Sequence, residues 1–223
     1  MKHKRLLSAV LLSITAVVFL SFIESILKPS YLVKSILKIL CFAGSVFFYS
    51  FAYKEDIFSL IHLKKKMPDK KLIFFLLFVY AGIILLFFLL KERIDLSAIR
   101  RSLLEKEGLN KDNFLFIFSY IILCNSFLEE AFFRGFLIEV FKKEGLYKAG
   151  SMYSAILFAL YHIGIVANWF QPLVFLLCIV GLSLAGLFLE WICERNDTLL
   201  ASYAVHAFAN LAINTIGTFM MFM

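Results

Sequence analysis

Long runs of hydrophobic residues, broken by short polar segments, make up most of this chain of 223 residues. A helix needs about 20 consecutive apolar residues to cross the hydrocarbon core of a bilayer. On that basis we predict seven membrane-spanning helices, with approximate bounds 6–27, 31–53, 72–90, 113–140, 149–167, 172–192 and 198–222. The pattern therefore indicates an all-α integral membrane protein, folded as a multi-pass helical bundle.

The composition supports this fold class and excludes a water-soluble domain. Hydrophobic residues make up 62% of the chain and charged residues 17%, whereas soluble domains have about 45–50% and about 25%. The predicted spans leave no room for a separate soluble domain. The first apolar run is too long for the core of a signal peptide and has no small-residue cleavage site, so we expect an uncleaved first helix.

The charged residues lie mainly between the spans and predict an orientation. A net charge of +7 can indicate nucleic-acid binding, but lysine and arginine between hydrophobic spans more often follow the positive-inside rule. We therefore expect no nucleic-acid partner. With the N-terminus inside, the inner segments hold 13 of these basic residues and the outer segments 7. We expect a multi-pass protein of the cell membrane with a cytoplasmic N-terminus and the lipid bilayer as a partner.

A few polar side chains lie inside the predicted spans, where an ionisable group costs about 2.5–3.5 kcal/mol and usually marks function. They are Asn125, Glu129, Glu130 and Arg134 in the fourth span, His162 in the fifth, and His206, Asn210 and Asn214 in the seventh. The 1.5 Å rise per helical residue places Glu129, His162 and His206 roughly 12–20 Å below the same membrane surface. A shared site requires such a common depth.

Helical spacing separates the roles of the two adjacent glutamates. Glu130 and Arg134 lie four residues apart and so share a helix face, as do His206 and Asn210. Glu129 lies about 100° round the helix from Glu130. We expect Arg134 to pair with Glu130 as a structural ion pair, while Glu129 faces a cavity.

The remaining polar residues of the apolar runs fit structural roles. We expect Asn125 and Asn214 to form hydrogen bonds between helices. Five charged residues lie close enough to span ends for their heads to reach water: Glu24, Lys34, Lys38, Glu139 and Glu190. The cysteines show no CxxC spacing. We expect them to act as small buried hydrophobic residues and to form neither a disulfide framework nor a zinc site. They are Cys41, Cys124, Cys178 and Cys193.

These residues discriminate among the known chemistries of intramembrane hydrolysis. A zinc-binding HExxH motif is absent, because an isoleucine, not a glutamate, follows His162. A serine nucleophile elbow is also absent, and no aspartate lies within a span to form an aspartyl dyad. A glutamate acting with histidines remains.

Three short motifs follow one another along the second half of the chain. The segment Glu129–Gly135 reads as EExxxRG, Phe158 to His162 as FxxxH, and His206 to Asn210 as HxxxN. Together they resemble the CPBP family, the CAAX proteases and bacteriocin-processing enzymes, also called the Abi family. The resemblance covers about residues 113–215 and implies a catalytic core at 113–223 and a helix count near eight. The N-terminal helices and charged loops at 1–112 carry no motif of the family. We expect them to form one integrated domain with the catalytic core.

The resemblance implies an intramembrane endopeptidase. Its substrate would be a membrane-associated protein or peptide, of CAAX type or bacteriocin-related. By analogy, Glu129 is the general base that activates a water, and His162 positions that water. His206 with Asn210 would donate hydrogen bonds to the oxyanion, and Arg134 would fix the helix geometry through its glutamate partner.

The cofactor and the class of function stay open at this point. The family is also described as metalloproteases, and Glu129, His162 and His206 could supply a two-histidine, one-carboxylate zinc site with an open water position. We favour the metal-free glutamate mechanism, because Asn210 is better explained as an oxyanion partner than as a zinc ligand. The alternatives are a proton-coupled transporter or channel that relays protons through the same residues, and a non-catalytic bacteriocin-immunity protein.

Overall fold

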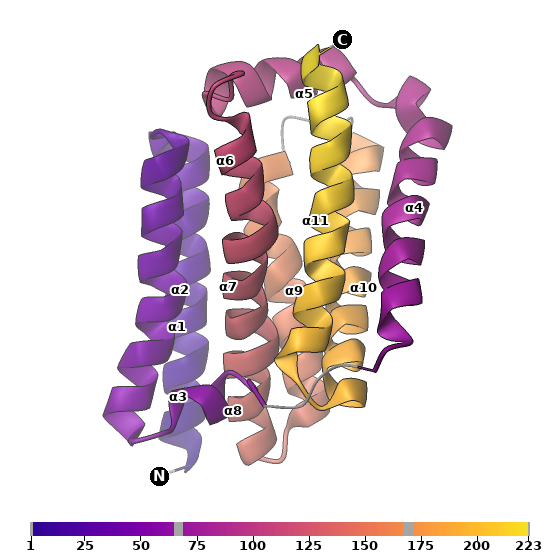
Figure 1. Cartoon of the computed structure of the whole chain (residues 1–223). Coiled ribbons are helices and arrows are strands. Elements are labelled where there is room, and N and C mark those ends of the chain that lie inside the picture. Colours follow the sequence, from indigo (N-terminus) through magenta and orange to yellow (C-terminus); the bar gives the residue numbers. More distant parts are fainter. Residues whose placement is uncertain (1, 65–68, 167–171, 223) are drawn as a thin grey trace.

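The computed structural model describes residues 2–64, 69–166 and 172–222, and every regular element in these ranges is a helix (Figure 1). The long helices are α1 Lys2–Phe22, α2 Tyr31–Tyr53, α4 Leu72–Leu90, α9 Tyr147–Val166, α10 Pro172–Asn196 and α11 Leu199–Phe222. A further long helix, 114–143, comprises α6 Phe114–Ser119, α7 Ser126–Glu130 and α8 Ile138–Lys143, joined by two π-helical segments. Short helices α3 Ile57–Leu60 and α5 Leu96–Arg101 lie in the longer connections. The predicted all-α class is confirmed.

Six helices of the described part of the chain are long and apolar enough to cross a membrane, so the chain is a multi-pass integral membrane protein. They are His3–Leu27, Tyr31–Tyr53, Leu72–Leu90, Phe114–Lys143, Phe175–Asn196 and Leu199–Met221. Helix α9 coincides with the predicted span 149–167, whose last residue lies outside the described residues. It is not among the six, and polar residues such as Lys148 and Ser151 interrupt its apolar sequence. The predicted count of seven spans is therefore not confirmed, although all seven predicted segments are helical.

The long helices run side by side, with the N-terminus at one end of the bundle and the C-terminus at the other (Figure 1). Large apolar side chains point outward from it, and the phenylalanines Phe51, Phe74 and Phe78 are 71–87% exposed. Such a surface would promote association in water. In a bilayer the same side chains contact the acyl chains, which explains the high phenylalanine content.

Helix 114–143 contributes much of the protein core. All of its residues from Ala131 to Leu137 are buried, and Phe42 of α2 stacks on Phe132 with ring centroids 4.4 Å apart. The π-helical segments Tyr120–Asn125 and Ala131–Leu137 flank α7 on either side. A π-helical turn changes the direction in which the following side chains point, and such turns are frequent at functional sites. The two segments therefore set how α7 presents its glutamates.

Gly135 allows the connection that follows α3 to lie directly against helix 114–143. A Cβ atom at Gly135 would lie 2.5 Å from the carbonyl oxygen of Ile61 and 2.6 Å from its Cα. The next residue, His62, has a left-handed φ of 55°, and its carbonyl accepts a 3.0 Å hydrogen bond from the amide of Leu199. The connection thus joins helix 114–143 to the start of α11, and glycine is the residue that permits this approach.

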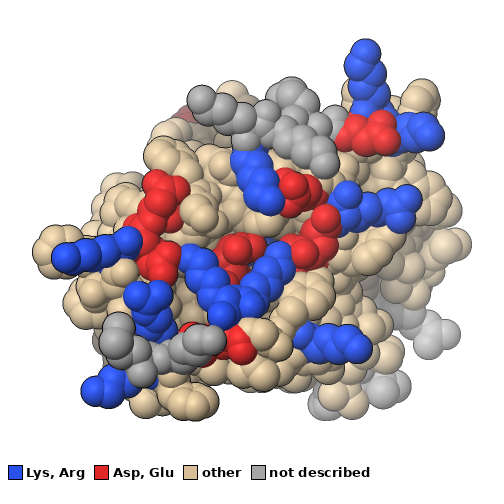
Figure 2. Space-filling view, turned by 90° about the horizontal axis from the view of Figure 1, so that it is seen from below, with Lys and Arg blue, Asp and Glu red and all other residues tan. Residues whose placement is uncertain are grey.

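Charged side chains of both signs gather at the end of the bundle where the N-terminus lies (Figure 2). Arg5 contacts Glu55 at 2.9 Å, and Lys142 pairs with both Glu139 and Glu194. Arg5, Glu55, Lys142 and Glu194 belong to connecting segments that the topology predicts on one side of the membrane, and the fold does bring those segments to one end. Which side of the membrane this end faces stays a prediction.

Candidate active site

Glu129 lies where three helices meet. Its side chain extends from α7 and is 1% exposed. Nε2 of His162 on α9 lies 4.0 Å from Glu129 Oε2, and Nε2 of His206 on α11 lies 3.7 Å from the same oxygen. The structure therefore brings together the three residues for which the sequence predicts a common depth in the membrane.

Hydrogen bonds on the far side of each ring orient the two imidazoles. His162 Nδ1 lies 2.7 Å from the carbonyl oxygen of Phe158. Because a carbonyl only accepts, Nδ1 carries a proton, and the ring presents its other nitrogen, Nε2, to Glu129. His206 Nδ1 lies 2.9 Å from Glu130 Oε1, so this ring also directs Nε2 to Glu129. Both Nε2 contacts exceed hydrogen-bond length, and a bridging water or substrate atom can connect the three groups.

The second glutamate is held by the arginine one turn further on. Arg134 NH1 lies 3.2 Å from Glu130 Oε1, and both side chains are almost fully buried. The guanidinium also lies over the ring of Phe158, 4.1 Å from its centroid, a favourable cation–π geometry. The predicted ion pair is present, and through Glu130 it supports the orientation of His206.

Asn210 faces α7, one turn along α11 from His206. Its Nδ2 group donates a 2.8 Å hydrogen bond to Ser126 Oγ, and Ser126 in turn donates to the carbonyl oxygen of Ile121 at 3.0 Å. One of the two N–H donors of the amide is thus used within the protein, and the hydrogen bond fixes the plane of the amide. Ser126, which the sequence did not single out, is the residue that positions Asn210.

Lys38 of α2 completes the surroundings of Glu129, and the sequence did not reveal it. Its Nζ group donates to Asn125 Oδ1 at 2.7 Å and lies 3.5 Å from Glu129 Oε1. Asn125 Nδ2 donates to the same Glu129 oxygen at 2.9 Å. Helical spacing could have predicted the Asn125 contact, because Asn125 precedes Glu129 by four residues. Nothing in the sequence relates Lys38 to either residue.

The structure corrects the expectation that several charged residues reach water at span ends. Lys38 points to Glu129 instead, and Lys34 is buried, with its Nζ 3.0 Å from Glu24 and 2.9 Å from Glu107. Glu190 is also buried. The inward positions of Lys34 and Lys38 let their charges pair inside the bundle, which lowers the cost of placing them in a membrane, whereas the carboxylate oxygens of Glu190 make no hydrogen bond among the described residues.

The donor set around Glu129 suits zinc by chemical type. Two imidazole nitrogens face the same carboxylate oxygen, and two histidines with one carboxylate are the ligand composition of many catalytic zinc sites. The ammonium group of Lys38, however, already lies 3.5 Å from the other oxygen of Glu129. Glu129, His162 and His206 are also not among the described groups of three ligand atoms that all lie within 4.8 Å of one another.

Comparison with known proteins agrees with the motifs. Residues 111–212, slightly less than half of the chain, match the family model described as type II CAAX prenyl endopeptidase Rce1-like. No curated protein matches the chain significantly. No solved structure matches it significantly either. The family match confirms, for these residues, the resemblance to the CAAX proteases of the CPBP family.

Proposed function

We propose that this protein is an intramembrane endopeptidase that hydrolyses a peptide bond in a membrane-associated protein or peptide, with Glu129 as general base. The observation that carries the proposal is the convergence of His162 Nε2 and His206 Nε2 on Glu129 Oε2, at 4.0 and 3.7 Å. A buried carboxylate flanked by two oriented imidazoles can hold and activate one water molecule.

The reaction needs one water and one proton carrier. Glu129 takes a proton from the water while the water oxygen bonds to the scissile carbonyl carbon. The electron pair of the carbonyl double bond moves onto the carbonyl oxygen. When the C–N bond breaks, the proton passes from Glu129 to the leaving amine. The products are a carboxyl group and a free amine, and Glu129 returns to its initial state.

The negative charge that develops on the carbonyl oxygen needs nearby N–H donors. Asn210 and the imidazolium form of His206 supply them, and we add Lys38. An ammonium group has three N–H donors and no acceptor, and Lys38 contacts the carboxylate that activates the water. Oriented donors of this kind are each worth about 2.7–4 kcal/mol in a dry site. In a metal-dependent variant of the mechanism, Glu129, His162 and His206 would hold the zinc ion, which would act as a Lewis acid.

We also propose that α9 crosses the membrane as a seventh span and that the charged end of the bundle is cytoplasmic. Two polar side chains of α9 form hydrogen bonds inside the bundle: Ser154 donates to the carbonyl oxygen of Phe133 at 2.7 Å, and Tyr153 and Ser13 share a hydrogen bond of 2.7 Å. Helices with internally satisfied polar groups are stable in lipid. The family match favours a CAAX-type substrate, and a bacteriocin-related peptide is the alternative.

A comparison of membrane proteins from cells that express the wild type or Glu129→Gln tests the proposal. We expect new protein termini, detected by mass spectrometry, with the wild type and none with Glu129→Gln. The matched control Glu105→Gln, at an exposed position in the connection before α6, should retain cleavage. Equal cleavage by wild type and Glu129→Gln would refute the mechanism. Solute flux into vesicles without any cleavage would indicate a transporter, and protection against a bacteriocin that survives the substitution would indicate an immunity protein.

A further inference from the structure

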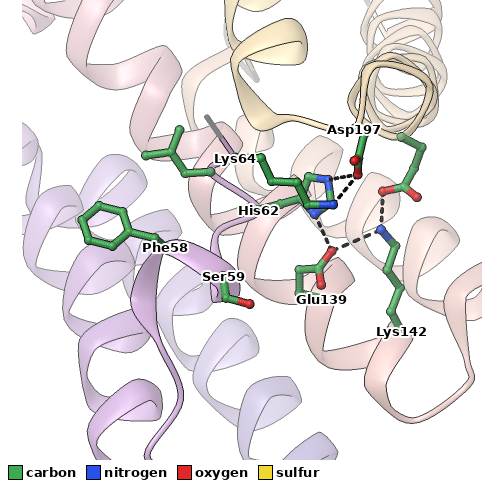
Figure 3. Close-up of a pocket in the computed structure, with 9 residues that line it drawn as sticks. Phe58, Ser59, His62, Lys64, Glu139, Lys142 and Asp197 are labelled. Atoms are coloured by element: carbon green, nitrogen blue, oxygen red, sulfur yellow. Dashed lines mark hydrogen bonds and ion pairs between the residues drawn. The ribbon is translucent and has the colours of Figure 1, made fainter. Parts of the chain in front are cut away.

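A second polar cluster lies at the end of the bundle where the N-terminus lies, and it shares no residue with the site around Glu129. It lines an open pocket of about 480 Å³ between the connection after α3, helix α8 and the turn from α10 to α11 (Figure 3). The charged side chains that line this described pocket are the carboxylates Glu139, Glu194 and Asp197 and the lysines Lys64 and Lys142. The excess of carboxylates favours a cation.

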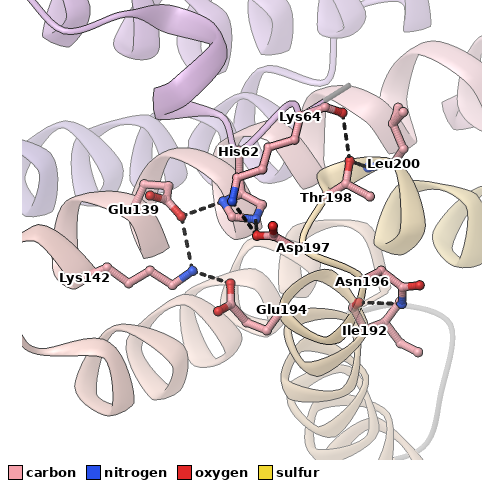
Figure 4. Close-up of polar contacts among 10 residues, drawn as sticks. All are labelled: His62, Lys64, Glu139, Lys142, Ile192, Glu194, Asn196, Asp197, Thr198 and Leu200. Carbon is pink, nitrogen blue, oxygen red and sulfur yellow. Dashed lines mark hydrogen bonds and ion pairs between the residues drawn. The ribbon is translucent and has the colours of Figure 1, made fainter. Parts of the chain in front are cut away.

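His62 lies in the middle of this cluster and is oriented as a metal ligand. Its Nδ1 atom lies 2.7 Å from Glu139 Oε1, and the side chain is 7% exposed. Its Nε2 atom makes no hydrogen bond and lies 3.4 Å from Asp197 Oδ1 (Figure 4). Metal-binding histidines commonly donate one ring N–H to a carboxylate, which leaves the other nitrogen free to coordinate.

Two neighbouring residues of α10 add donors of a different chemical type. The ligand atoms of His62, Cys193 and Glu194 all lie within 4.8 Å of one another, and Cys193 is 1% exposed. Asp197, in the turn that follows, brings a second carboxylate to the same imidazole nitrogen. Zinc accepts imidazole, thiolate and carboxylate ligands, and four of them in a tetrahedral arrangement complete a structural site.

We propose that His62, Cys193, Glu194 and Asp197 bind a structural zinc ion. As the zinc–sulfur bond forms, the Cys193 thiol releases its proton to solvent. Lys142 pairs with Glu194 Oε1, and Lys64 pairs with Asp197 Oδ1, the oxygen that also lies near His62 Nε2. Binding of the ion therefore requires these lysines to share the carboxylate oxygens with it or to move away. The ion joins the connection after α3 to the turn between α10 and α11, two segments 131 or more residues apart in sequence. The proposal does not depend on the proposed protease activity.

The lysine pairs do not remove the need for a further cation. In the pocket, three carboxylates face two ammonium groups, and a Cys193 thiolate would add a fourth negative charge. One of these two excess negative charges is present before the ion binds, and the other appears only when the Cys193 thiol loses its proton; the zinc ion balances both. Glu139 keeps its hydrogen bond to His62 and its contact with Lys142 at 3.1 Å, so it supports the histidine rather than binding the ion.

Zinc content of the purified full chain tests the site. The protein in detergent is incubated with Zn²⁺, exchanged into zinc-free buffer and analysed by mass spectrometry, and we expect about one zinc ion per chain. His62→Gln and Cys193→Ser should each lose the ion. Glutamine retains an N–H group for Glu139, and serine has nearly the size of cysteine, so both variants should fold. The matched controls Cys178→Ser, also on α10, and Glu129→Gln should retain the ion.

Two further measurements keep the proposal falsifiable if a variant folds poorly. Glu139→Gln should weaken zinc affinity about 10–100-fold, as expected for loss of a supporting carboxylate. Substitution of Co²⁺ should give a thiolate-to-metal charge-transfer band that Cys193→Ser removes. A folded wild type that binds no zinc would overturn the proposal. So would zinc that persists in both His62→Gln and Cys193→Ser, or zinc that is lost only in Glu129→Gln, because the ion would then lie elsewhere.

Discussion

Replacing Gly135 by alanine tests how closely the connection after α3 approaches helix 114–143. The added methyl carbon would lie 2.5 Å from the Ile61 carbonyl oxygen, 2.6 Å from its Cα and 2.7 Å from its carbonyl carbon. Ordinary contact begins near 3.4 Å, so the two backbones must separate by about 0.9 Å, the difference between 3.4 and 2.5 Å. The neighbouring bond from the Leu199 amide to the His62 carbonyl opposes that movement.

Overpacking a tight core costs about 1–3 kcal/mol, and we expect Gly135→Ala at the upper end of this range because the neighbour is backbone. For chains of this length each kcal/mol lowers the melting temperature by about 2–4 °C. The assay is thermal unfolding of detergent-purified protein, followed by loss of the monodisperse peak in size-exclusion chromatography. The control is Gly44→Ala in α2, where an added Cβ meets nothing within 4 Å. Its melting temperature should equal or exceed that of the wild type, because alanine favours helix. A Gly135→Ala protein as stable as Gly44→Ala would refute the reasoning.

Two further predictions concern the charges inside the bundle. Lys38→Met should lower kcat/KM in a peptide-cleavage assay by at least about a hundredfold. The physical reason is that a charge pair at 3.5 Å is worth about 5 kcal/mol at an effective dielectric constant near 20. The control Lys28→Met, at an exposed position, should leave kcat/KM unchanged. Arg134→Met should cost about 3–5 kcal/mol of stability, because it leaves Glu130 buried without its cation. The double variant with Glu130→Gln should recover part of this loss in thermal unfolding, and a double variant less stable than Arg134→Met would contradict the assignment of a structural pair.

Much of the candidate site could be predicted because it depends on one-dimensional quantities. Depth in a membrane follows from helical rise and the distance to a span end, so Glu129, His162 and His206 could be grouped before their contacts were known. The pairing of Glu130 with Arg134 follows from a four-residue spacing within one helix. Depth and spacing both depend only on the position of a residue along its own helix.

The contacts that could not be predicted depend on how one helix is rotated relative to another. Lys38 lies at a depth that also suits a side chain reaching toward water, and packing contacts such as that of Phe42 on Phe132 fix which face of α2 meets Glu129. The π-helical segments on either side of α7 change the direction in which the side chains point. These segments have no clear signature in the sequence. The cluster at His62 combines residues from distant segments, and the absence of a CxxC spacing concealed the role proposed for Cys193.

The contact between Lys38 and Asn125 has a consequence for the order in which the protein is made. The two residues are 87 positions apart, and at about 5–20 residues per second the ribosome needs roughly 4–17 s to synthesise the intervening chain. During that interval α2 has left the ribosome with an ammonium group in its apolar sequence and without its partner. At this depth the ammonium group can reach toward water, so we expect Lys38 to turn inward to Asn125 only after helix 114–143 has been inserted.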